Sequence, residues 1–418
     1  MSRYLLATWD GGGVILAELA LAEALIARGH DVLVLADDTV ETEARQAGVE
    51  FAPWIRAPHA RARDRQRALI RDWELRNPLK EAELVGTKLF FGPAQEFADD
   101  TTDHIDAWHP DVVIADAFLG GVMAAAEHAR CPLAAVAPNV NMLRIDGMPA
   151  MGGGFRPPKG RPGRVRDAAM HKLNDRLLDL TPLNEARQQL GLPKVPTMDA
   201  MVRQADRVIL LTSKAFDFTP PSPDPQVVYG GIPVPCHPEV TWTPPWPDDG
   251  RPAVLVGLGT TYQQQEALLQ RVIDALGRLD VHALVTLGGL AGHHLERVPD
   301  NVHVVDSVPH GAVLPHIDLC ITHGGHGTVV RSLAAAVPVL VVPLGRDQPD
   351  NAARAVAVGA GVRVSRRAKV DELHRTIAVA LVDRGLRGAA RAMAERMAPE
   401  IGAPAAVDAL ETMARGAR

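Results

Sequence analysis

The chain has 418 residues, of which 47% are apolar and 22% charged, and its formal net charge is −6 at pH 7. This length exceeds the roughly 250–300 residues at which a single core stops growing, so two domains are expected. The acidic balance supplies no basic surface for tracking a phosphate backbone, which argues against a nucleic-acid partner. No stretch approaches the ~18 consecutive apolar residues of a membrane span.

The first residues and the cysteines are typical of a cytoplasmic protein. Residues 1–9 lead directly into a strand-like pattern and lack the long apolar core and small-residue cleavage site of a signal peptide. Cys131, Cys236 and Cys320 are isolated and odd in number, so neither a disulfide framework nor a structural zinc site is expected. We therefore expect a cytoplasmic location and no bound metal.

Strand and helix patterns alternate through the first half. A short apolar run at residues 4–9 leads into Asp-Gly-Gly-Gly, and residues 14–28 have the Leu and Ala spacing of a largely buried helix. Further apolar runs, of the kind found in parallel sheets, lie at residues 31–36, 111–116, 132–137 and 207–212. Residues 1–218 are therefore predicted to form a doubly wound α/β domain that binds the acceptor.

A second domain is predicted after a proline-rich linker. Residues 219–249 are crowded with proline, which is excluded from helix interiors and central strands. In the predicted second domain, residues 250–395, apolar strands are expected at 253–258, 283–287, 302–305, 319–322 and 339–342. Residues 370–418 look helical, and the last part, 396–418, could cross back to the first domain. The predicted fold class is α/β, with two doubly wound Rossmann-like domains facing across a cleft.

The strongest functional signal is a loop rich in glycine and histidine. Residues 321–328 read Ile-Thr-His-Gly-Gly-His-Gly-Thr and connect an apolar strand to a helix. Glycines let the backbone approach a ligand, and the free N–H groups at the start of a helix suit a diphosphate. His323, His326 and Thr328 could add hydrogen bonds to phosphate oxygens. No acidic cluster accompanies this loop, so a magnesium-free anion site is predicted.

A second polar pair follows the next strand. Asp347 and Gln348 lie in the loop at the expected carboxyl end of that strand, where ligands bind in open α/β sheets. A carboxylate beside an amide suits the hydroxyl groups of a sugar.

Together these motifs resemble a known family. The stretch from Thr322 to Gly361, THGGHGTVVRSLAAAVPVLVVPLGRDQPDNAARAVAVGAG, resembles the donor-binding signature of family 1 glycosyltransferases, a GT-B class that includes bacterial antibiotic-tailoring enzymes. Residues 257–261 and 307–310 are similar to two further donor loops of that family. The resemblance implies inverting, metal-independent transfer from a UDP- or dTDP-sugar to an apolar small-molecule acceptor, such as the scaffold of a natural product. The resemblance is also compatible with a homodimer.

The resemblance also assigns the parts of the donor to separate loops. The residues expected to hold the diphosphate are His323, Gly325, His326, Gly327 and Thr328. Those expected beside the base are Val308 and His310, and those near the β-phosphate are Thr260 and Thr261. Asp347 and Gln348 would contact the sugar.

Two departures from the family pattern affect the chemistry. Where many relatives have a glutamate that binds the ribose, this chain has Arg331. The position of the family's catalytic histidine is occupied by Val14, which cannot take a proton. The first candidate base is Asp116, which matches the family's histidine-orienting aspartate and, at a strand end, is expected to face the cleft; Asp10 is the second, although either could instead cap a helix.

The acceptor pocket and two other functions depend on weaker signals. Residues 79–97 and 139–154 carry Phe and Met side chains that suit an apolar acceptor but could equally be core. A Rossmann oxidoreductase would use the Gly-rich loop and an acid at Asp37, yet the full GxGxxG is absent. A catalytically silent relative that binds a nucleotide sugar remains a further alternative, because the usual histidine is missing.

Overall fold

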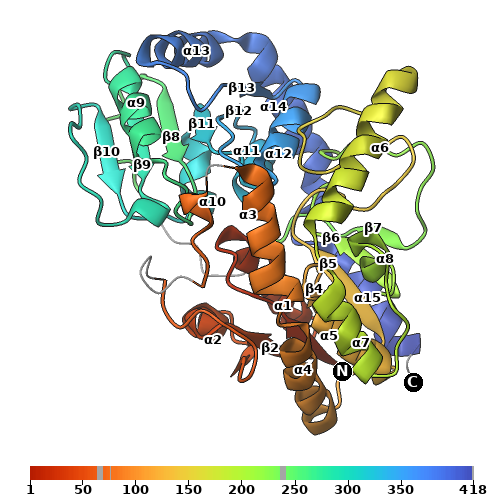
Figure 1. The fold of residues 1–418 in the computed structure, drawn as a ribbon. Helices are drawn as coiled ribbons and strands as arrows, with labels where there is room; N and C mark the ends of the chain where they lie inside the picture. The colour runs from red at the N-terminus through yellow and green to blue at the C-terminus, as the bar shows by residue number, and fades with distance from the viewer. Residues whose placement is uncertain (64–68, 76, 236–241, 417–418) are drawn as a thin grey trace.

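The computed structural model describes residues 1–63, 69–75, 77–235 and 242–416, and these contain two parallel sheets (Figure 1). The first sheet has seven strands in the order β3-β2-β1-β4-β5-β6-β7. Their bounds are β1 (Arg3–Ala7), β2 (Asp31–Ala36), β3 (Glu50–Pro53), β4 (Val112–Asp116), β5 (Leu133–Ala137), β6 (Arg207–Leu210) and β7 (Val227–Tyr229). Every pairing in it is parallel, as the continuous apolar runs predict.

Helices cover both faces of this sheet. They are α1 (Gly13–Ala27), α2 (Glu41–Gln46), α3 (Pro78–Val85), the π-helix η4 (Gly86–Phe91), α4 (Ala94–Trp108), α5 (Gly120–His128), α6 (Gly160–Leu177), α7 (Thr181–Gln189) and α8 (Met198–Val202). The alternation of side chains along β1 shows why both faces need cover: Leu5 and Ala7 pack under α4 and α5, whereas Tyr4 and Leu6 pack under α1.

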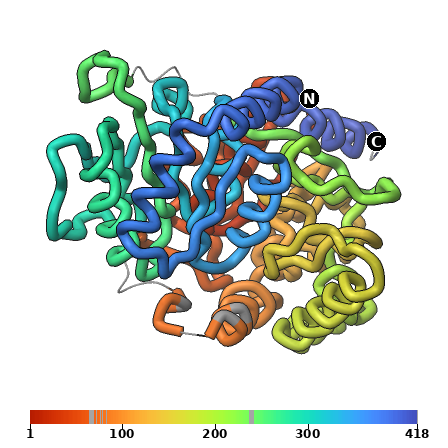
Figure 2. The backbone as a smooth tube through the Cα atoms, turned by 90° about the horizontal axis from the view of Figure 1, so that it is seen from above, coloured from red at the N-terminus to blue at the C-terminus, as the bar shows by residue number. Residues whose placement is uncertain are grey.

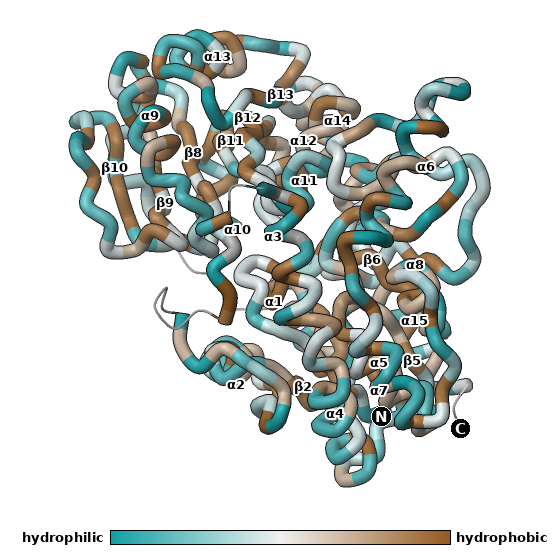
Figure 3. Tube along the Cα trace, viewed as in Figure 1, coloured by the Kyte–Doolittle hydropathy of each residue, from teal (hydrophilic) through white to brown (hydrophobic). Residues whose placement is uncertain are grey.

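The second sheet has six strands in the order β10-β9-β8-β11-β12-β13. They are β8 (Ala253–Gly257), β9 (His282–Thr286), β10 (Val302–Val305), β11 (Leu319–Thr322), β12 (Val339–Val341) and β13 (Gly361–Arg363). Its helices are α9 (Glu266–Leu276), α10 (His310–Val313), α11 (His326–Ala334), α12 (Gln348–Ala357), α13 (Val370–Val382) and α14 (Arg384–Met397). Apolar residues follow the inner strands in Figure 3, and polar ones follow the outer loops. The two parallel sheets, each packed against helices, confirm the predicted fold class.

The last helix, α15 (Pro404–Gly416), leaves the second sheet and packs on the first. Its Val407 and Leu410 join the core beneath α1, and Arg28 at the end of α1 pairs with Asp408 and Glu411. The two termini consequently lie close together in both views of the chain (Figures 1 and 2).

Some elements differ from the expectation. The helical stretch predicted from residue 370 to 418 is divided into α13, α14 and α15, because Asp383 caps α14 and residues 401–403 break the next turn. The sequence reading missed β3, β7 and β13, which have only three or four residues each. β7 lies within the expected linker and pairs at the edge of the first sheet, where nearby prolines are tolerated. Cys236 and the other linker residues through 241 lie outside the described residues.

None of the helices in the described part of the chain has the length and apolar character needed to cross a membrane.

Candidate active site

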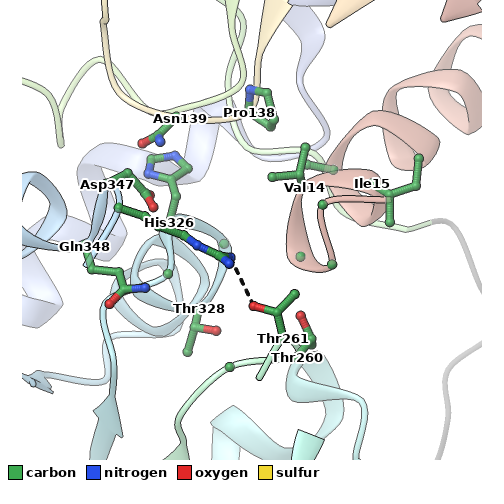
Figure 4. Close-up of a pocket in the computed structure, with 18 of the residues that line it drawn as sticks. Val14, Ile15, Pro138, Asn139, Thr260, Thr261, His326, Thr328, Asp347 and Gln348 are labelled. Atoms are coloured by element: carbon green, nitrogen blue, oxygen red, sulfur yellow. Dashed lines mark hydrogen bonds between the residues drawn. The ribbon is translucent and has the colours of Figure 1, made fainter. Parts of the chain in front are cut away.

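A cavity of about 2370 Å³ lies between the carboxyl ends of the two sheets. The first sheet contributes the loop after β1 and the segments around Phe90 and Met142, and the second contributes the loops after β8, β11 and β12. Figure 4 shows Val14 and Pro138 on one side of this space and Thr261 and Thr328 on the other. The cavity therefore joins the predicted donor loops to the predicted acceptor segments.

The loop between β11 and α11 presents backbone N–H groups to the cavity. Gly325 is the N-cap of α11, and no side chain from the described residues caps that helix. Gly324 has φ of +101°, and a Cβ on Gly325 would lie 2.8 Å from the His323 ring, so both positions require glycine. Unpaired N–H groups and the helix dipole make this turn suitable for an anion.

His323 is buried at the start of this loop and lines the cavity. Burial lowers the pKa of the imidazole to about 4; a hydrogen bond with the Gly257 backbone opposes that shift and nearby Arg346 adds to it. The ring is therefore neutral at pH 7. A neutral imidazole has one N–H, so His323 donates to a phosphate oxygen in the tautomer whose N–H points into the cavity rather than at the Gly257 backbone.

His326 lines the same cavity, but its ring is already engaged. Its Nδ1 lies 3.1 Å from Asn351 Oδ1, and its ring centroid is 6.0 Å from that of Phe216. Burial also lowers the pKa of His326 to about 4. Of the two histidines expected to bind phosphate, His326 is thus held by Asn351 of α12, and His323 is held by the Gly257 backbone.

The threonine loop after β8 meets the glycine loop after β1. A Cβ on Gly12 would lie 2.5 Å from Thr260 Oγ1 and 2.9 Å from Thr261 Cγ2. Arg346 Nη1 donates a hydrogen bond of 3.1 Å to Thr261 Oγ1, drawn as a dashed line in Figure 4. The predicted β-phosphate contacts therefore lie where the two halves of the molecule touch.

Val308 and His310 line the cavity beside β10 and α10, as expected for a base-binding loop. Burial and the positive charge of Arg331 lower the pKa of His310 to about 4. This imidazole is also neutral at pH 7, so it offers hydrogen bonds rather than charge to a ligand.

Asp347 and Gln348 both line the cavity at the start of α12. Gln348 Oε1 accepts from Leu344 N at 2.7 Å, and its Nε2 donates to Gln263 at 3.0 Å. Asp347 Oδ2 accepts from Asn351 Nδ2 at 2.7 Å, and burial raises the pKa of this carboxyl. Gln348 thus fixes the loop before α12. A sugar hydroxyl bound to the Gln348 amide would share that amide with Leu344 and Gln263.

Asp10 lines the cavity within a set of polar contacts. Its carboxylate accepts from Thr39 Oγ1 at 2.7 Å and from Gly12 N at 3.1 Å, and it forms an ion pair of 2.7 Å with Arg63 Nε. These partners hold the carboxylate at the end of β1 and stabilise its charge.

Asp116 does not face the cleft, contrary to the expectation from its place at the end of β4. It is 1% exposed, is absent from the residues that line the cavity, and accepts from Phe118 N at 2.8 Å. It also pairs with Glu18, whose other partner is the Thr8 hydroxyl. Burial raises the pKa of Asp116 to about 6 and that of Glu18 well above its usual range.

Sequence reasoning missed Glu18 as a site-adjacent acid. The available signal was a lone carboxylate within the apolar segment that became α1. It occupies the layer directly beneath the position where relatives carry a histidine, because Val14 is one turn before it on α1. Val14 itself lines the cavity, so an apolar side chain stands at the expected place of the base.

Aromatic and methionine side chains line the first-domain part of the cavity. The rings of Trp9 and Phe90 lie 4.9 Å apart, and Phe90 stacks on Phe118 at 5.0 Å. Met142 and Met151 lie on the same side. Such a wall is suited to an apolar ligand, and methionine side chains can adapt to its shape.

Comparison with known proteins agrees with this geometry. Residues 270–413 match the model of the Erythromycin biosynthesis protein CIII-like, C-terminal domain. The 4'-demethylrebeccamycin synthase of Lentzea aerocolonigenes is 28% identical over 98% of this chain and 99% of its own length.

Two solved structures share the fold over nearly the whole chain. CalG4, the calicheamicin glycosyltransferase, has a TM-score of 0.75 at 18% identity, covering 99% of this chain and 98% of that one. The glycosyltransferase VinC in complex with dTDP has a TM-score of 0.70 at 20% identity and 99% coverage of both chains. The chain therefore has the GT-B fold, and over nearly its whole length it is similar to proteins of antibiotic and natural-product pathways.

Proposed function

We propose that this glycosyltransferase moves a sugar from a dTDP- or UDP-sugar to a hydrophobic small molecule, with inversion at the anomeric carbon. The observation that carries the proposal is one cavity with an uncapped helix N-terminus and neutral His323 on one side and an aromatic wall on the other. The similarity to VinC, solved with dTDP, supports a thymidine donor, and the similarity to 4'-demethylrebeccamycin synthase supports a natural product as acceptor.

The arrangement suits a single displacement. The acceptor nucleophile, held against Trp9 and Phe90, forms a bond to the anomeric carbon as the bond from that carbon to the β-phosphate oxygen breaks. The diphosphate leaves with the electron pair, and the α11 N–H groups and His323 stabilise its charge. Attack from the face opposite the leaving group inverts the anomeric carbon. The acceptor's proton passes to a base.

Asp10 and Asp116 remain the proposed bases, and the geometry favours Asp10 because it is the one that lines the cavity. An ion-paired carboxylate is a weak base toward an alcohol. We therefore propose that the natural acceptor carries an acidic group, such as a phenol or a heteroaromatic N–H. Asp116, with Glu18 behind it, would act only through a group that reaches the cavity.

We further propose that transfer needs no metal ion, because the charge of the leaving diphosphate is met by the α11 turn, Arg346 and Arg331. Within the described residues, no group of three His, Cys, Asp or Glu side chains is arranged to hold a metal. We place the protein in the cytoplasm, and take residues 1–218, 219–249, 250–395 and 396–418 as first domain, linker, second domain and returning helix. The proposed function is compatible with a monomer or a homodimer.

The test is turnover with a panel of dTDP- and UDP-sugars and phenolic, indolic and aliphatic acceptors, in buffer containing a chelator. We expect release of nucleoside diphosphate and a product whose anomeric configuration is opposite to that of the donor, with phenols faster than aliphatic alcohols. Donor binding without turnover on any acceptor would favour the catalytically silent alternative. Retention of configuration, or a strict requirement for added metal, would contradict the proposed mechanism.

A further inference from the structure

Arg331 is a cation on α11 that lines the donor side of the cavity. Burial alone lowers the pKa of its guanidinium, and no carboxylate in the described residues opposes that shift. The other arginines around the donor loops are engaged: Arg346 donates to Thr261, and Arg366 donates to the Leu344 carbonyl. Arg331 therefore stands out as a desolvated charge without an acidic partner in the described part of the chain.

The position of Arg331 on the helix directs it toward the anion site. It lies three residues after Thr328, so the two residues share one face of α11. Side chains on a helix lean back toward its N-terminus, and one turn spans only ~5.4 Å. A guanidinium starting at residue 331 can consequently reach the ligand bound at the first turn. Burial and, to a smaller extent, the charge of Arg331 lower the pKa of His310, so Arg331 also lies near the expected base-binding loop.

The chemistry of this side chain limits what it can recognise. A glutamate at this position, which the family resemblance implies for many relatives, could accept hydrogen bonds from ribose hydroxyls. A guanidinium has five N–H donors and no acceptor, and it forms its strongest contacts with phosphate or carboxylate oxygens. A partly buried cation without an acidic partner is also costly, so a ligand that brings negative charge gains affinity by pairing with it.

We propose that Arg331 binds non-bridging phosphate oxygens of the nucleoside diphosphate and thereby shifts donor selection from the ribose hydroxyls to the phosphates. This inference rests on the proposed function, because it assumes that the donor's diphosphate lies at the α11 turn. It follows that a 2'-deoxynucleotide and a ribonucleotide bind with similar affinity, since Arg331 gains nothing from the 2'-hydroxyl.

The experiment compares dissociation constants for dTDP, UDP and thymidine by calorimetry and ligand-observed NMR. Arg331→Met should weaken dTDP and UDP about tenfold or more and leave thymidine unchanged, because thymidine has no phosphate. Arg331→Lys keeps the charge and should recover part of the loss. Arg375→Met, at an exposed position on α13, removes the same charge away from the cavity and is the matched control.

Substitution with the family's residue tests selectivity. Arg331→Glu should bind UDP better than dTDP, because a carboxylate accepts from both ribose hydroxyls and repels phosphate. The inference is overturned if Arg331→Met, folded by circular dichroism, binds dTDP as tightly as the wild type. It is also overturned if thymidine weakens as much as dTDP, which would assign Arg331 to the nucleoside. If the wild type binds no nucleoside diphosphate, the proposed function itself fails.

Discussion

Glu18 and Asp116 are two acids buried against each other beneath the glycine loop. Glu18 is fully buried and accepts a hydrogen bond from the Thr8 hydroxyl, and no cation is among the described groups that shift its pKa. Burial and the Asp116 carboxylate raise the pKa of Glu18, which favours a protonated Glu18 beside Asp116 in the folded chain. In that state the pair carries one negative charge instead of two where α1 packs against β4.

This pair predicts a specific dependence of stability on pH. The folded chain keeps a proton on Glu18 that the unfolded chain releases above a pH of about 4.3, so stability falls as the pH rises from there to the raised folded pKa. Glu18→Gln imitates the protonated acid and should remove this loss. The difference between variant and wild type should grow by up to about 1.4 kcal/mol per pH unit between pH 5 and the folded pKa.

Urea unfolding at pH 5.5, 6.5 and 7.5 measures this difference, with Glu83→Gln at an exposed position of α3 as the control. A Glu18→Gln variant whose advantage stays constant or shrinks as the pH rises would mean that Glu18 is ionised in the folded protein.

At the scale of elements, α12 links the donor and acceptor sides of the cavity. Its first residues are at the predicted sugar site, and one turn later Asp350 accepts hydrogen bonds from Gly152 N at 2.6 Å and Gly154 N at 2.7 Å. The loop held in this way carries Met151, which lines the acceptor side. A ligand that orders the start of α12 should therefore also order the acceptor loop.

We predict that Asp350→Asn raises the KM for the acceptor several-fold, because the neutral amide keeps one acceptor oxygen in place of two and loses a charge-assisted bond. The KM for the donor should change much less. Steady-state kinetics with each substrate varied in turn, and with the exposed Asp248→Asn as control, separates the two effects. Equal changes in both KM values would indicate a general loss of folding instead.

At the scale of the whole molecule, a buried ion pair joins the two halves. Arg354 of α12 contacts Asp217, which follows the last central strand of the first sheet, at 2.6 Å, and their side chains are 3% and 0% exposed. Arg354 also lies 4.6 Å from the centre of the Phe218 ring. Together with α15, this contact fixes the cleft across which transfer takes place.

Removing one partner of this ion pair should lower the stability of the fold more than removing both. Arg354→Met leaves the Asp217 charge buried and unpaired, which costs about 3–5 kcal/mol of stability. The double variant with Asp217→Leu should recover a substantial part of that loss, since no charge is then left in the interior. Thermal and urea unfolding of the single and double variants measures this. Equal losses would show that packing, rather than the unpaired charge, dominates.

The sequence predicted the two parallel sheets because their strands are continuous apolar runs, and the donor loops because glycine and histidine spacing there is specific. It could not place Asp116, since a carboxylate at a strand end faces either the cleft or the interior according to its neighbours. Here the neighbour is Glu18, 98 positions earlier in the chain, and no local pattern reveals that contact. β3, β7 and β13 are too short to give a periodic signal.

In the proposed reaction, the α11 turn and His323 hold the leaving diphosphate. The most direct test of this role is kcat/KM for sugar transfer by His323→Ala, compared with the wild type and with the control His374→Ala on α13. Loss of a hydrogen bond to the departing oxygen predicts a decrease of about 10²–10³-fold for His323→Ala and almost none for the control. A folded His323→Ala variant that transfers sugar at the wild-type rate would show that His323 does not hold the leaving diphosphate.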